Sequence, residues 1–157
     1  MTINLRDQSG QTIIEVMIAT LVVGMVLTAV AATLTVSVKN TAQSRYQEVA
    51  RAQAQSGLEL FRRERTKLGW QEFQNVINNG TYCLNVLPAD STAFAAMSPT
   101  PCSSGVAVIG TDFTRDATVT VVSADEVKVE MSVKWVDGVI NKEVKLTQVF
   151  QRYENEQ

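Results

Sequence analysis

The sequence predicts an α+β protein in which one long N-terminal helix packs against a small antiparallel β-sheet. Two observations lead to this prediction. An uncharged apolar run at residues 16–38 continues into an amphipathic helical pattern, and apolar and polar residues alternate without error at 127–135. At 157 residues the chain has room for one small domain besides the apolar segment.

The apolar run is long enough to cross a membrane as a helix. It contains no charged residue and no proline from Val16 to Val38. At about 1.5 Å per residue the run spans roughly 34 Å, which exceeds the hydrocarbon core of a bilayer. A secretory signal peptide fits poorly, because the run is too long for one and the helical pattern continues beyond its end. We therefore expect a single-pass membrane segment.

The helix continues after the run with one apolar face. Apolar residues recur every three or four positions and form a stripe at Tyr46, Ala50, Ala54, Leu58 and Phe61. The opposite face is charged, at Arg45, Glu48, Arg51, Glu59 and Arg62. No proline interrupts the pattern, and Gly57 is its weak point. The sequence thus predicts one helix from Thr12 to Arg65, with the stripe covering the sheet.

Three antiparallel strands are predicted in the C-terminal third. Residues 127–135 form one strand, and residues 113–123 form a preceding strand. Asp137 and Gly138 predict a two-residue type I′ turn flanked by Val136 and Val139. The cross-strand pairs that follow from this turn are Trp135–Ile140, Met131–Val144, Val129–Leu146 and Glu130–Lys145.

The two cysteines predict a disulfide. Cys83 and Cys102 are too few for a metal site made of cysteines alone, and both stand in turn-like polar sequence. A bridge between them would stabilise the domain by about 3 kcal/mol and implies an oxidising compartment. Residues 69–112, which include both cysteines, are punctuated by glycine and proline and predict loops and short elements without a definite fold.

The composition argues against an enzyme. There is no histidine, which removes His-based triads, His general bases and most zinc sites, and no phosphate-binding glycine loop or nucleophile motif is present. We expect no cofactor and no metal. Fourteen basic and sixteen acidic residues give a net charge of −2, so nucleic acid is not expected as a partner. The basic run at 62–67 is expected to be a solvated helix end.

One acidic residue stands just inside the apolar segment. Glu15 lies within Ile13-Ile14-Glu15-Val16-Met17, and a carboxylate inside a membrane is costly enough to indicate a function. The alternative is an interfacial position from which the carboxylate reaches water. The ten residues before the run, Met1 to Gly10, are polar and end in glycine.

The stretch Gly10-Gln11-Thr12-Ile13-Ile14-Glu15-Val16 resembles the prepilin processing signal of type IV pilins and type II secretion pseudopilins. The resemblance covers about residues 5–38. It implies a pilin-like fold, cleavage between Gly10 and Gln11, N-methylation of Gln11, and Glu15 as the fifth residue of the mature chain. Gln11 departs from the phenylalanine usual in the family, and the proline often found in this helix is absent. In a filament, Glu15 would offset the N-terminal charge of a neighbour and specify register.

The resemblance implies a structural subunit of a type IV pilus, a competence pilus or a type II secretion pseudopilus. The strand-rich end with its Trp-Val-Asp-Gly turn resembles minor members of the family. Prepilin peptidase and other pilin or pseudopilin subunits, bound through the N-terminal helix, are the implied partners. The precursor would sit in the cytoplasmic membrane with its C-terminal domain outside, and the mature subunit in an extracellular or periplasmic filament.

The alternative is an ordinary single-pass membrane-anchored binding protein with a small extracytoplasmic domain. Both hypotheses place the C-terminal domain outside, although Lys39, Arg45 and Arg51 follow the apolar run and the positive-inside rule places basic residues on the cytoplasmic side. The cysteines and the leader outweigh this rule, because large domains cross a membrane despite their charge. Under the hypothesis of a processed filament subunit the predicted organisation has four parts. They are a leader peptide at 1–10, the transmembrane half of the helix at 11–38, its amphipathic half at 39–66, and a loop-rich region followed by a β-sheet at 67–157.

Overall fold

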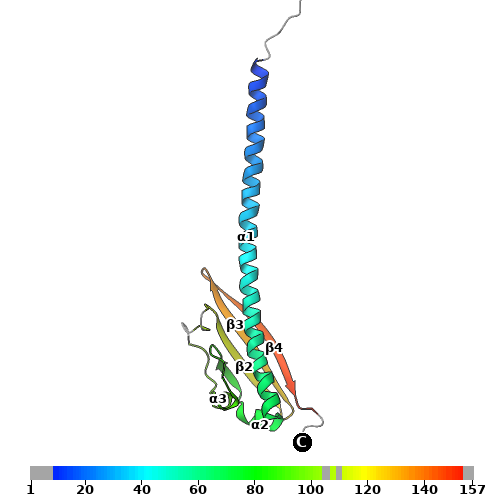
Figure 1. Ribbon diagram of the computed structural model, residues 1–157, viewed down its shortest axis with the longest axis vertical. Coiled ribbons are helices and arrows are strands. Elements are labelled where there is room, and N and C mark those ends of the chain that lie inside the picture. Colours follow the sequence, from blue (N-terminus) through cyan, green and yellow to red (C-terminus); the bar gives the residue numbers. More distant parts are fainter. Residues whose placement is uncertain (1–8, 104–106, 109–110, 154–157) are drawn as a thin grey trace, which may run out of the picture. The chain divides into compact units, whose positions relative to one another are not determined.

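The computed structural model describes residues 9–103, 107–108 and 111–153 (Figure 1). The chain divides into two units, residues 1–45 and residues 46–157. The elements are α1 (Ser9–Leu68), α2 (Trp70–Val76), β1 (Gly80–Cys83), α3 (Ser91–Ala95), β2 (Thr114–Ser123), β3 (Glu126–Asp137) and β4 (Ile140–Gln151). The helix predicted from Thr12 to Arg65 is therefore present and three residues longer at each end. The predicted leader lies outside the described residues except for Ser9 and Gly10.

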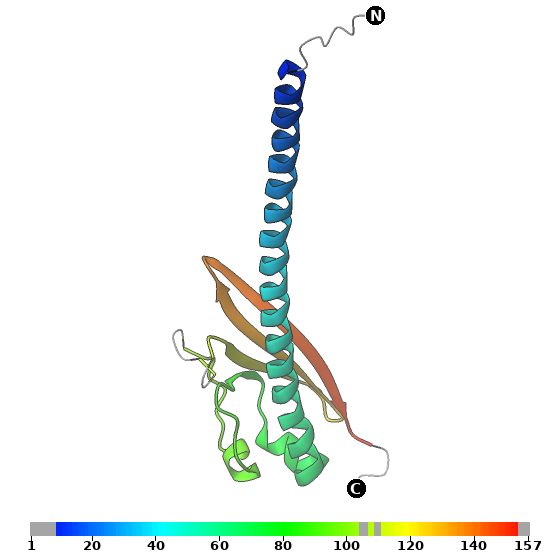
Figure 2. The ribbon, with the colours of Figure 1, turned by 45° about the horizontal axis from the view of Figure 1, so that its top comes forward.

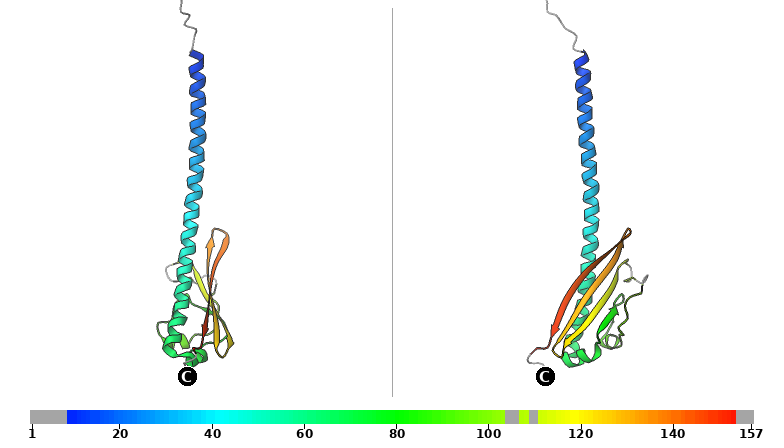
Figure 3. Two further views of the ribbon diagram at one scale, coloured as in Figure 1. Left: turned by 90° about the vertical axis from the view of Figure 1, so that its right-hand side faces the viewer. Right: turned by 180° about the vertical axis from the view of Figure 1, so that it is seen from behind.

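The second unit is a four-stranded antiparallel sheet covered on one face by a helix. Its strand order is β1-β2-β3-β4, with each strand antiparallel to its neighbour. The part of α1 within this unit lies against one face of the sheet (Figure 3). The predicted stripe is buried at Ala50, Ala54, Leu58 and Phe61, whereas Tyr46 is 48% exposed at its edge. The predicted apolar stripe is thus confirmed at these four positions, because residues three and four positions apart lie on one side of a helix.

Aromatic side chains close the core at both ends. At one end Phe73 lies between Phe94 and Phe150, with ring centroids 6.2 and 6.0 Å away. At the other end Phe113 lies between Tyr46 and Trp135, at 6.1 and 5.6 Å. Strand β3 runs from the first cluster towards the second, whereas the second half of α1 runs from the second cluster towards the first. The strand and this half of the helix are therefore antiparallel.

The predicted β3–β4 register is wrong by two residues. Asp137 stays in β3 and pairs with Ile140, so the loop consists of Gly138 and Val139. Gly138 has φ +65°, and no other described residue of the turn has a positive φ. This is the pattern of a turn with glycine at its first loop position, whereas a type I′ turn would require Asp137 itself to adopt a positive φ.

The shift preserves the two faces of the hairpin, because a displacement of two residues keeps each side chain on its side. Met131 now pairs with Leu146 rather than Val144, and both are apolar. Val129 pairs with Gln148 and Trp135 with Lys142. Lys145 still forms an ion pair with Glu130 at 3.1 Å, although the residue directly opposite Glu130 is Thr147.

Candidate functional site

The predicted processing residues lie at the start of α1. Gly10 and Gln11 belong to its first turn and Glu15 to its second. Ile13, Ile14 and Val16 around Glu15 are all more than 60% exposed. Within the described part of the chain, the Glu15 carboxylate makes no hydrogen bond and no ion pair.

The first half of α1 has the properties of a membrane span. Its most apolar window has a mean hydropathy of 2.5, and none of that window is buried within the protein. The threonines of the run do not present free hydroxyl donors, because each donates to a carbonyl three or four residues earlier. The hydroxyl hydrogen bonds run from Thr20 to Met17, from Thr28 to Gly24 and Met25, from Thr33 to Ala29 and Val30, and from Thr35 to Ala31. The segment can thus enter lipid without leaving these groups unsatisfied.

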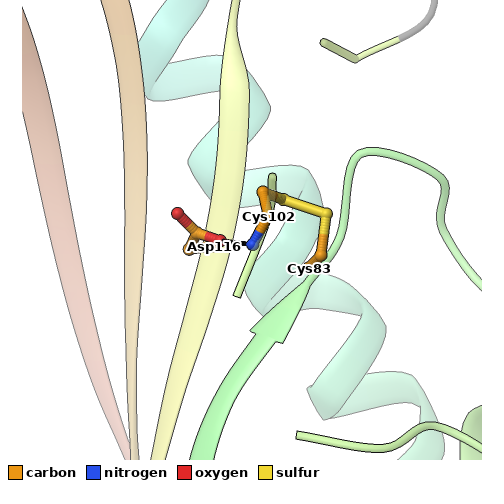
Figure 4. A group of neighbouring side chains, drawn as sticks. All are labelled: Cys83, Cys102 and Asp116. Atoms are coloured by element: carbon orange, nitrogen blue, oxygen red, sulfur yellow. Dashed lines mark hydrogen bonds between the residues drawn. A yellow bond between two sulfur atoms is a disulfide. The ribbon is translucent and has the colours of Figure 1, made fainter. Parts of the chain in front are cut away.

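The disulfide between Cys83 and Cys102 is present, with 4.5 Å between the Cα atoms. It joins the end of β1 to the loop that precedes β2 (Figure 4). The backbone N–H of Cys83 also donates to the carbonyl of Thr100, and the N–H of Cys102 donates to Asp116 Oδ1 at 2.9 Å. The bond therefore fixes the segment 84–101, whose one described element is the short helix α3, at its two ends.

Asp116 completes the group drawn in Figure 4. Its carboxylate is almost fully buried and receives the N–H of Cys102 on one oxygen and Lys134 Nζ, at 3.4 Å, on the other. Cys83, Cys102 and Asp116 lie close enough together to resemble a set of metal ligands. The two sulfur atoms are bonded to each other, however, so Asp116 serves here to hold the backbone of the bridged loop.

A buried carboxylate on α1 holds the same loop from the other side. Glu64 is fully buried, and it accepts hydrogen bonds from Ser91 Oγ and, at 2.7 Å, from Arg63 Nε. Burial alone would raise the pKa of Glu64. The hydrogen bonds from Ser91 and Arg63, with the charges of Arg63 and Lys67, outweigh burial and hold its pKa below the ordinary value of 4.5.

A buried arginine ties the sheet to the helix. Arg115 on β2 is 2% exposed, and burial lowers its pKa. Its guanidinium donates to the carbonyl of Leu84 through Nε and Nη2, and to the carbonyl and side chain of Gln53 on α1 through Nη1. In the sequence, Ala117, Val119 and Val121 alternate with polar residues, and the same period places position 115 on the inner face of the sheet. The sequence therefore contained a signal for the burial of Arg115.

The basic run at 62–67 is only partly the solvated helix end that the sequence predicted. Arg62 is exposed and pairs with Glu59 at 2.8 Å, but Glu64 and Arg65 are buried. The guanidinium of Arg65 lies 4.2 Å from the ring centroid of Tyr153 and donates to the carbonyl of Gln151 at 2.8 Å. Glu64 and Arg65 pack the end of the domain, because the buried side of the helix continues beyond Phe61 through positions 64 and 65.

Comparison with known proteins identifies the N-terminal segment. Residues 5–31 match the family model described as the prokaryotic N-terminal methylation motif. Neither the curated proteins nor the solved structures compared with the chain gave a match. The matched residues include Gly10, Gln11 and Glu15 and most of the exposed apolar helix. The match shows that residues 5–31 carry a prokaryotic N-terminal methylation motif, and it supports the prepilin-like processing signal that this stretch resembles.

Proposed function

We propose that this chain is a structural subunit, of the minor kind, of a type IV pilus, a competence pilus or a type II secretion pseudopilus. The observation that carries the proposal is the match of residues 5–31 to the N-terminal methylation motif, on a helix whose apolar side chains have no partner within the described chain. Such a helix requires lipid in the precursor and the helices of other subunits in a filament.

In this proposal prepilin peptidase cuts between Gly10 and Gln11, and Gln11 is methylated. The precursor is held in the cytoplasmic membrane by the first half of α1, with the disulfide-bonded domain outside. The disulfide supports that side of the membrane, because such bonds persist in oxidising compartments. The mature chain then leaves the membrane for the filament through contacts of its N-terminal helix with those of other subunits.

Glu15 has the assembly role in this proposal. The new α-amino group of Gln11 and the Glu15 carboxylate are both costly in an apolar environment, so placing the amine of one subunit near the carboxylate of another offsets both costs. The pair acts across subunits, which agrees with the lack of a described partner for Glu15 within the chain.

The experiment that tests the proposal is mass spectrometry of the protein recovered from its native membrane. We expect a chain that begins at Gln11 and carries one added methyl group. Gly10→Leu should leave the uncut precursor in the membrane, whereas Gly24→Leu, within the same helix, should not prevent cleavage. A native chain that retains Met1 would support the second candidate, a single-pass anchored binding protein.

A further inference from the structure

The hairpin of β3 and β4 ends in an exposed apolar tip. Pairing between β2 and β3 stops at Lys134, so residues 135–137 and their β4 partners form a two-stranded ribbon beyond the four-stranded part of the sheet (Figure 2). At its tip Val136, Val139 and Ile140 are 64%, 98% and 56% exposed. Proteins normally place polar residues at such open strand ends, so three apolar side chains at one tip point to a partner.

The tip lies at the end of the domain where the chain enters it. Trp135, next to the tip, contacts Phe113, and Phe113 contacts Tyr46, the first residue of the second unit. The hairpin extends about 10 Å past Trp135, at about 3.3 Å per residue. Only residues 39–45 separate Tyr46 from the end of the apolar run, so the domain is tethered close to any membrane that the run crosses.

The distribution of the apolar side chains favours lipid as the partner. Trp135 is buried on the helix-facing side, so Val136 lies on the opposite side of the ribbon. Ile140 pairs with Asp137 and shares the helix-facing side, and Val139 is at the end of the loop. A flat protein surface would contact only one face of the tip, whereas lipid surrounds an inserted tip on all sides, so apolar groups on both faces fit lipid better.

The net charge of the ribbon is compatible with lipid as the partner of the tip. Asp137 and Lys142 are its charged residues, and their charges cancel, so anionic lipid does not repel the tip. We propose that the β3–β4 tip inserts Val136, Val139 and Ile140 into the surface of the membrane that α1 crosses. This contact would fix how the domain stands on the membrane before assembly. It requires only that α1 spans a membrane, and not that the chain forms filaments.

The test uses the full chain in vesicles of phosphatidylcholine and phosphatidylglycerol, at a protein density low enough that copies rarely meet. An environment-sensitive fluorophore is attached to Val139→Cys, and the native cysteines do not react because they are bonded to each other. Ala124→Cys is the matched control, since Ala124 is an exposed residue in the turn at the opposite end of the sheet. We expect brominated lipid chains to quench the label at position 139 several-fold more than the label at 124.

A second pair of variants tests the apolar groups themselves. A label on Asn141→Cys, at the base of the tip, should lose its lipid quenching when Val136→Ser and Ile140→Ser are added, while the disulfide and the thermal unfolding of the domain stay unchanged. Equal quenching at positions 139 and 124 would overturn the proposal. Protection of position 139 that arises only at high protein density would also overturn it, because a second copy of the chain would then cover the tip.

Discussion

Gly57 on α1 lies against Met131 on β3, and the end of the Met131 side chain occupies the space that a Cβ atom of residue 57 would need. A Cβ atom at position 57 would lie 2.5 Å from Met131 Cε and 2.7 Å from its Sδ. Met131 is fully buried, so the end of its side chain has little room to move away. The sequence marked Gly57 only as a weak point of the helix. In the structure, a side chain at position 57 would require the end of the Met131 side chain to move.

Gly57→Ala should therefore destabilise the domain, although alanine is the better helix former. Overpacking a core costs about 1–3 kcal/mol, which outweighs the roughly 1 kcal/mol that alanine gains over glycine in a helix. Adding Met131→Val, which removes the clashing atoms, should restore part of the loss. Thermal unfolding of the four proteins in a double-mutant cycle measures this coupling.

Gly24→Ala is the matched control for Gly57→Ala, because a Cβ at position 24 meets no atom within 4 Å. It should leave unfolding of the domain unchanged. If Gly57→Ala raises the unfolding temperature, the Met131 side chain has found another position and the close approach does not require glycine.

The parts of this fold that could be predicted from sequence are those set by local periodicity. The stripe on α1 and the alternation in β2 and β3 each repeat over many residues, so the buried face follows from the pattern. The turn could not be placed to the residue, because Asp137-Gly138 and Gly138-Val139 both offer a glycine and only the backbone decides between them. Elements α2, β1 and α3 are too short for any period to show.

The partners of the buried polar groups could not be predicted because they are distant in sequence. Glu64 is bonded to Ser91, and Arg115 to Leu84 and Gln53, so their burial depends on a loop and a helix that no local pattern brings together. The processing signal is the opposite case. Gly10, Gln11 and Glu15 lie within one short stretch, so the signal is readable from sequence, whereas their proposed roles involve a peptidase and other subunits.

The stability of the domain should depend on the ionisation of Glu64. Its pKa is lower in the folded chain than the ordinary 4.5, so its contribution is complete above the unfolded pKa and is lost as the pH falls through the folded value. Glu64→Gln removes the charge from hydrogen bonds that are worth about 1.5–3 kcal/mol. The difference in unfolding temperature between wild type and Glu64→Gln should thus be largest at neutral pH and shrink below 4.5.

Ser91→Ala removes one of these hydrogen bonds and should reduce the acid sensitivity of unfolding in the same pH range. Glu59→Gln is the control, since Glu59 is an exposed acid on the same helix. A constant difference between wild type and Glu64→Gln across the pH range would mean that the charge of Glu64 does not stabilise the fold.

Reduction of the Cys83–Cys102 bond should loosen the segment between β1 and β2. The bond closes a loop with a sequence separation of 19, so its loss should lower the free energy of unfolding by about 3 kcal/mol. Replacing both cysteines with serine should have the same effect and should make treatment with a reductant harmless. Intact mass before and after reduction, which should differ by two hydrogens, and thermal unfolding check this. Two thiols that alkylate in native, unreduced protein would contradict it.

Replacing Glu15 should block assembly without harming the precursor. If its carboxylate offsets the N-terminal charge of a neighbour, Glu15→Ala leaves that charge unpaired in an apolar environment, which typically costs about 3–5 kcal/mol. Glu15→Gln keeps the shape but not the charge and should be nearly as harmful. Cleavage, membrane insertion and domain unfolding should stay normal, while recovery in sheared filaments falls relative to membrane-retained protein. Glu48→Gln, an exposed acid on the amphipathic half of α1, is the control. Wild-type assembly of both Glu15 variants would make this residue an interfacial acid and favour the single-pass anchor.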